Sequence, residues 1–135
     1  MEYKKTYKAL ILFFIVMSVL MIGGAVLFGI YLPPHSSRYI IWCISACMAV
    51  LTLIIHKTGY VYWYNNISYE EAEKAGADRR RAFSLSHLKL FGIFFVCQTV
   101  FSVAMALLNV SQWVDFSVGC VSLCIIAIYT VKFKL

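Results

Sequence analysis

The strongest constraint on this chain is the apolar run ALILFFIVMSVLMIGGAVLFGIYL, which covers residues 9–32 without a charged side chain. At about 1.5 Å per residue, roughly 20 helical residues cross the ~30 Å hydrocarbon core of a bilayer. The run is also longer than the roughly 7–15 apolar residues of a signal peptide. It therefore predicts a retained first transmembrane helix.

Three similar runs follow, and the composition agrees with them. The chain is 62% hydrophobic and 13% charged, whereas a soluble domain averages about 45–50% and about 25%. Backbone groups in lipid must form hydrogen bonds within their own segment, so the runs should be helices. Short joints between spans one and two and between spans three and four favour antiparallel neighbours. We predict an all-α integral membrane protein, one domain over 1–135, with four transmembrane helices in an antiparallel bundle at about 9–32, 39–60, 88–108 and 113–131 and a cytoplasmic loop at 61–87.

The basic residues predict the orientation of these spans. Of twelve Lys and Arg residues, eleven would lie on one side of the membrane and only Arg38 on the other. Cytoplasmic segments carry the excess of Lys and Arg, so both termini are expected in the cytoplasm and the protein in the plasma (inner) membrane as a multi-pass protein. The net charge of +6 fits this bias and a contact with anionic lipid. No nucleic-acid-binding motif is present, and we expect no nucleic-acid partner.

The loop at 61–87 has signals of its own. Ser68 followed by Glu71 fits a capping box, and Gly76 is typical of a helix end. We predict a short amphipathic cytoplasmic helix over about 68–75, then a new helix from Asp78 that continues into the third span.

The loop also carries a dense group of charges whose purpose the sequence leaves open. These residues could contact a partner protein or lipid headgroups, or they could act only as a stop-transfer cluster that fixes topology. The candidate contact residues are Glu70, Glu71, Arg79, Arg80 and Arg81.

Polar residues within the spans are few. Gln98, Thr99 and Ser102 predict an intramembrane polar contact in the third span. Arg38 and Asp115 both fall near the outer ends of spans, where they could form an ion pair or stay separately hydrated.

Histidines and cysteines are the only candidates for a bound group. The histidines would lie at the inner ends of the spans and the cysteines in the outer halves, so no mixed site is expected. We expect no catalytic residue, metal or cofactor, although the sequence does not decide whether these groups bind anything. The residues in question are His56, His87, Cys43, Cys47, Cys120 and Cys124.

The functional expectation follows from the absence of catalytic motifs in the sequence and from the presence of features that suit contacts with other proteins. The chain lacks a catalytic motif, and it offers a charged loop and small-residue steps such as Ala25–Gly29 and Ser45–Ala49, which let helices approach closely. We expect a non-enzymatic accessory or structural subunit of a membrane complex. Its partner would be another membrane protein or a second copy. The alternative is an oligomeric transporter or channel for a small molecule or ion.

Overall fold

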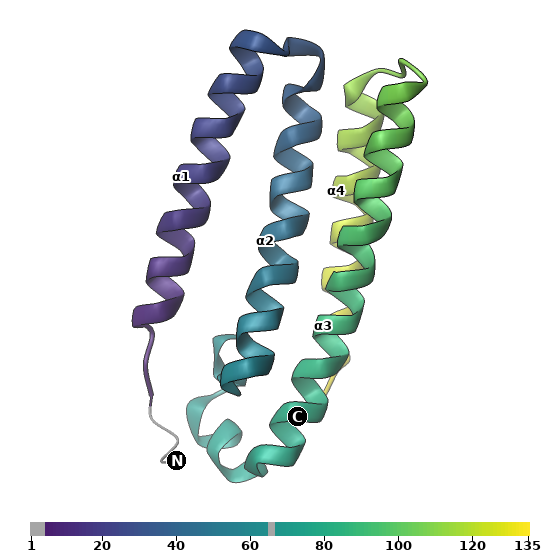
Figure 1. Ribbon diagram of the computed structural model, residues 1–135. Helices are drawn as coiled ribbons and strands as arrows, with labels where there is room; N and C mark the ends of the chain where they lie inside the picture. The colour runs from purple at the N-terminus through teal and green to yellow at the C-terminus, as the bar shows by residue number, and fades with distance from the viewer. Residues whose placement is uncertain (1–4, 65–66) are drawn as a thin grey trace.

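The computed structural model describes residues 5–64 and 67–135. This part of the chain is helical and contains no strand; each of its four long helices is long and apolar enough to cross a membrane. The sequence prediction of an all-helical chain with four candidate transmembrane helices is therefore confirmed. The elements are α1 (Lys8–Tyr31), η1 (Pro33–His35), α2 (Ser36–Thr58), η2 (Val61–Trp63), α3 (Tyr69–Leu107) and α4 (Gln112–Thr130), shown in Figure 1.

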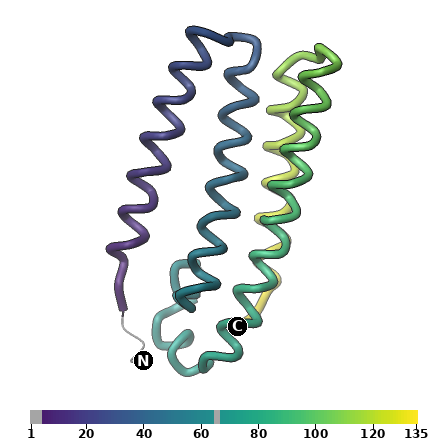
Figure 2. The backbone as a smooth tube through the Cα atoms, viewed as in Figure 1, coloured from purple at the N-terminus to yellow at the C-terminus, as the bar shows by residue number. Residues whose placement is uncertain are grey.

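The backbone trace shows how these helices are arranged (Figure 2). Consecutive long helices run in opposite directions, so the α1–α2 and α3–α4 joints lie at one end, which we call the joint end. The start of α1 and the C-terminus of the chain lie at the opposite end, which we call the terminal end. Helices α2, α3 and α4 all pack against one another, whereas α1 packs mainly against α2. The fold is therefore a three-helix core with α1 at its side.

The start of α3 is set by the capping box that the sequence contains. The Ser68 hydroxyl accepts a hydrogen bond from the Glu71 N–H at 3.1 Å, and the Glu71 carboxylate accepts one from the Ser68 N–H at 2.9 Å. At Gly76 the backbone has φ 76° and ψ 168°, which only glycine adopts easily. Gly76 is therefore non-helical and divides α3 into two helical stretches, close to where the sequence predicts one helix to end and the next to begin.

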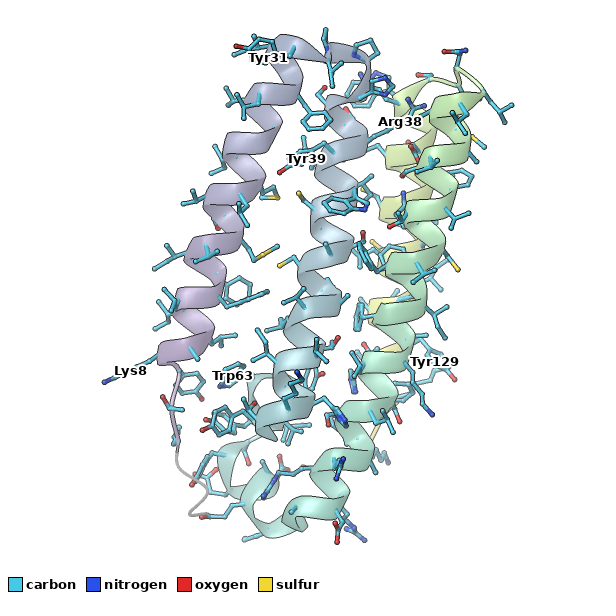
Figure 3. All side chains as sticks on the ribbon, viewed as in Figure 1. Lys8, Tyr31, Arg38, Tyr39, Trp63 and Tyr129 are labelled. Atoms are coloured by element: carbon cyan, nitrogen blue, oxygen red, sulfur yellow. The ribbon has the colours of Figure 1, made fainter. Side chains whose placement is uncertain are left out.

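The apolar core lies mainly at the terminal end. The segment that follows α2 folds back beneath the helices and buries Val61, Tyr62 and Trp63. Figure 3 shows Trp63 in this region, far from Tyr31 and Arg38 at the joint end. The Tyr62 hydroxyl and the Trp63 indole N–H both donate hydrogen bonds to the carbonyl of Thr6, at 2.9 and 3.0 Å. These bonds fasten the segment before α1 to the core.

Helices α2 and α4 approach closely at Gly119. A Cβ atom built there would lie 2.3 Å from Cγ1 of Ile41 and 3.1 Å from Oε1 of Gln98. By contrast, a Cβ built at Gly92 on α3 would meet no heavy atom of the described chain within 4 Å outside its own stretch of helix backbone and its two chain neighbours. Only glycine therefore permits the observed α2–α4 distance at Gly119.

We expect Gly119→Ala to lower the midpoint of thermal unfolding in detergent. The added methyl group must displace Ile41, and forcing extra atoms into a packed contact typically costs about 1–3 kcal/mol. The matched variant Gly92→Ala should keep or raise the midpoint, because alanine is the better helix former by about 1 kcal/mol. Equal midpoints for the two variants would contradict close packing at Gly119.

Candidate functional site

The most distinctive feature inside the helices is a buried ion pair between α2 and α4. Nε of Arg38 lies 2.8 Å from Oδ2 of Asp115, and both side chains are buried. Asp115 belongs to the first turn of α4, where the helix dipole favours an acid. Arg38 lies in the first turn of α2, where the dipole disfavours a cation. The carboxylate of Asp115 therefore compensates an otherwise unfavourable position.

The second carboxylate oxygen of Asp115 connects the pair to α3. Its Oδ1 accepts hydrogen bonds from the Ser102 hydroxyl at 3.1 Å and from the Gln98 amide at 3.4 Å. The Gln98 amide also donates to the Ser102 hydroxyl at 3.2 Å. The structure thus brings two separately predicted groups, the outer ion pair and the third-span polar residues, into one network. We call Arg38, Gln98, Ser102 and Asp115 the polar cluster.

Thr99, the remaining predicted polar residue of this span, makes a different contact. Its hydroxyl donates to the Phe95 carbonyl at 2.8 Å and accepts from the Trp42 indole N–H at 3.1 Å. This bond ties α3 to α2 outside the polar cluster.

The remaining guanidinium nitrogens of Arg38 reach the joints. Nη2 donates to the Val110 carbonyl, and Nη1 lies 3.1 Å from Nδ1 of His35. Gln112 links the same joints, since its side-chain oxygen accepts from the Ser37 N–H at 2.9 Å and its amide donates to the Pro33 carbonyl at 3.2 Å. The joint end is therefore held by polar contacts rather than by an apolar core.

Sequence reasoning did not find three residues of this region. Gly119 follows Asp115 by four residues, a spacing that places both on one helix face and could have revealed it. His35 and Gln112 had no comparable signal, because their contacts depend on how the two joints face each other.

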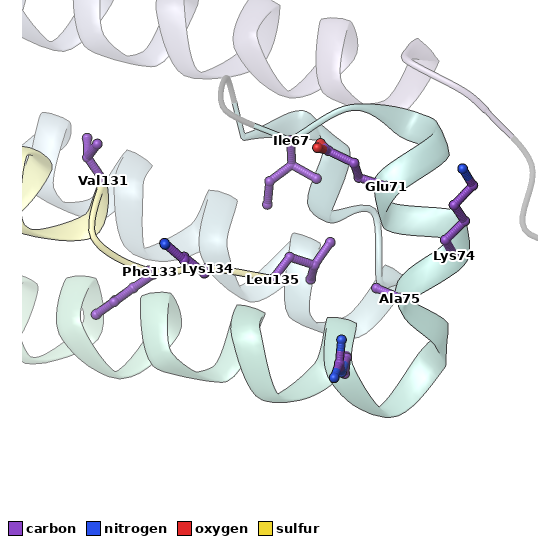
Figure 4. A pocket seen from close by; sticks show the side chains of 9 residues that line it. Ile67, Glu71, Lys74, Ala75, Val131, Phe133, Lys134 and Leu135 are labelled. Carbon is purple, nitrogen blue, oxygen red and sulfur yellow. The ribbon is translucent and has the colours of Figure 1, made fainter.

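The charged residues of the predicted loop divide between two cavities. Glu71 and Arg79 line a cavity of about 470 Å³ beside the C-terminal segment, shown in Figure 4. Arg80 and Arg81 line a second cavity of about 600 Å³ at the end of α2. Glu70 is fully exposed, and hydrogen bonding, first of all to its own backbone N–H, lowers its pKa. The five residues therefore do not line a single cavity.

The histidines and cysteines remain apart. Nδ1 of His56 lies 3.0 Å from the Ser84 hydroxyl, whereas the His87 ring stacks on Tyr64 with 4.3 Å between ring centroids. Within residues 5–64 and 67–135, no group of three or more His, Cys, Asp or Glu side chains is arranged to hold a metal ion. All five cysteines are free: Cys43, Cys47, Cys97, Cys120 and Cys124.

No family model matches the chain, and no match was found among curated proteins or solved structures. The functional argument therefore depends on the geometry of the chain itself. In the polar cluster, the carboxylate oxygens and the guanidinium are engaged with other residues of the chain. Such an arrangement orients helices.

We expect the single variants Arg38→Met and Asp115→Leu each to lower stability by about 3–5 kcal/mol. Each leaves one buried charge without its partner, which is the costly outcome for a buried pair. The double variant should be more stable than either single variant, because it removes both charges. Thermal unfolding of all four proteins in one detergent measures this cycle. Additive losses would mean that the two side chains do not interact.

Proposed function

We propose that this chain is a multi-pass protein of the plasma (inner) membrane, an antiparallel bundle whose terminal end faces the cytoplasm. The distribution of charge supports this orientation. The terminal end carries Lys57, Arg79, Arg80 and Arg81, whereas Arg38 at the joint end is paired with an acid. In this placement the kinked start of α3 stands in the cytoplasm.

Cysteine labelling tests this orientation. In a background with the five native cysteines replaced, Lys74→Cys should react with a membrane-impermeant maleimide only after the cells are permeabilised. Asn109→Cys, at the α3–α4 joint, should react in intact cells, because both positions are exposed on opposite ends of the bundle. Labelling of position 74 in intact cells would overturn the proposed orientation.

We further propose that the protein is a non-enzymatic accessory or structural subunit that acts through helix packing. The observation that carries this proposal is the exposure of α1. Of its residues, all of which the structure describes, only Phe13 is buried. In the most apolar stretch of each span, 6% of residues are buried in α1, against 28% in the span that contains α2, 22% in α3 and 11% in α4. Most of α1 is therefore available to lipid or to another helix.

One face of α1 suits a partner helix. The residues of this face follow one another in the sequence at intervals of four and three positions in turn. This spacing is typical of a helix that packs against another helix at a small crossing angle. The face is smooth, because it is mostly β-branched and has a glycine at its centre, and β-branched side chains lose little freedom on packing. We call it the open face; it consists of Leu12, Val16, Val19, Gly23, Val26 and Ile30.

The alternative of an oligomeric transporter or channel has less support. A transport path needs polar groups that face a passage. The polar cluster instead joins its members to one another and to the joint backbone. The subunit interpretation uses α1 for association and leaves the cluster its role in orienting α2, α3 and α4.

A bulky residue at the centre of the open face tests the proposal. We expect Gly23→Leu to abolish association with a partner protein, or self-association, because its side chain would separate the helices. Gly29→Leu is the matched control: both glycines are exposed and have no heavy atom of the described chain near the Cβ position, but Gly29 lies on another face of α1.

The measurement is the stoichiometry of proteins that co-purify in mild detergent, together with the mass of the particle by light scattering. The native protein and Gly29→Leu should show the same stoichiometric complex, and Gly23→Leu should show a monomer. A native protein that purifies alone as a monomer would count against the subunit proposal.

A further inference from the structure

A basic cavity lies where α2 ends beside α3. Its volume is about 600 Å³, and three cationic side chains line it: Lys57 from α2, and Arg80 and Arg81 from α3. No acidic residue is among the described residues that line it. We call it the basic cavity; the residues that complete it are His56, Thr58, Gly59 and Ala77.

The walls of this cavity are fixed by contacts between distant parts of the chain. Gly59 ends α2 with φ 74°, and a Cβ at that position would lie 3.8 Å from Nε of Arg80. Nη1 of Arg80 donates a hydrogen bond to the Ala72 carbonyl at 2.9 Å. The contact between His56 and Ser84 holds α2 against α3 on the membrane side. The cationic groups are therefore gathered before any ligand binds.

The depth of the cavity matches the headgroup layer of a bilayer. Counting back from Leu107, about 20 residues of α3 cross the hydrocarbon and reach about residue 88. The backbone of Arg81 lies about 10 Å further, at the outer limit of the headgroup layer, and its long side chain can reach back to the level of the phosphates. One helical turn from the cations toward the membrane, Leu53 precedes Lys57 by four residues and Leu85 follows Arg81 by four. Both leucines are exposed, by 40% and 37%.

We propose that the basic cavity binds the phosphate of an anionic membrane phospholipid, whose glycerol backbone and first acyl-chain carbons lie along Leu53 and Leu85. The three cations repel one another, and a phosphate offsets that repulsion. A cluster that only fixed topology would need the number of cations and not their convergence on one cavity. The proposal uses the membrane placement proposed above, and it is independent of association through α1.

The cavity of Figure 4 provides an internal comparison. It also has cationic side chains, Lys74, Arg79 and Lys134, but it includes the carboxylate of Glu71, which caps α3. The described lining of this cavity therefore includes an acid, whereas that of the basic cavity does not. Two charge-neutralising double variants can thus remove equal charge from the two cavities.

The test is the binding of short-chain phosphatidylglycerol to the whole chain in neutral detergent. Binding is measured as the change in the midpoint of thermal unfolding with lipid concentration. The native protein should show a saturable rise, and Lys74→Gln/Lys134→Gln should show the same. Lys57→Gln/Arg81→Gln should bind roughly thirtyfold more weakly, as expected for two lost contacts of a cation with an anionic headgroup. Short-chain phosphatidylcholine and inorganic phosphate are titrated in parallel.

Three outcomes would overturn the proposal. Equal losses in the two double variants would show a general effect of net charge. Equal binding of phosphatidylcholine would show an apolar groove without headgroup recognition. Inorganic phosphate that stabilises as well as the lipid would show a site for a soluble anion. Should Lys57→Gln/Arg81→Gln be less stable without lipid, native mass spectrometry decides: the native protein should retain phosphatidylglycerol and this variant should not.

Discussion

The ion pair between Arg38 and Asp115 determines how the helices of the core are placed. Apolar helices in lipid have little preference for one face over another, because lipid tails and aliphatic side chains are equally apolar. A helix with a buried charge does have a preferred face, because a buried charge without its partner is strongly unfavourable. The pair fixes α2 against α4, and the hydrogen bonds of Asp115 to Gln98 and Ser102 add α3. Gly119 then allows the close approach that this network needs.

Helix α1 lies outside this network, and its contacts differ in kind. At the joint end it meets α2 through the ring of Tyr39, which stacks on Phe28 with 4.6 Å between centroids and leaves room only for glycine at position 24. The Tyr39 hydroxyl donates to the Leu20 carbonyl at 2.8 Å. These contacts hold α1 on one side only. The three-helix core and the largely uncovered helix α1 are thus two consequences of where the polar residues lie.

The sequence was sufficient for the helices but not for their packing. Apolar runs reveal transmembrane helices because the thickness of hydrocarbon sets their length, and Ser68 with Glu71 reveals a helix start because the cap is local. The side position of α1 had no such signal, since its residues are apolar on every face. The depth and charge of Arg38 and Asp115 suggested an ion pair, but from the sequence the two side chains could equally have been hydrated separately. That Gln98 and Ser102 also reach Asp115 depends on helix rotation, which spacing within one helix does not determine.

The two ends of the bundle differ in whether their cationic side chains are paired with acids, and this difference connects the fold to the proposed function. At the joint end a single cation is buried and neutralised by an acid of the same chain. At the terminal end cations from α2 and α3 surround a cavity without an acid among its described lining residues. In the proposed orientation, the negative cytoplasmic surface of the membrane would stabilise the second arrangement and would not affect the first. The same asymmetry therefore favours one orientation in the bilayer and supplies the charge that an anionic headgroup would neutralise.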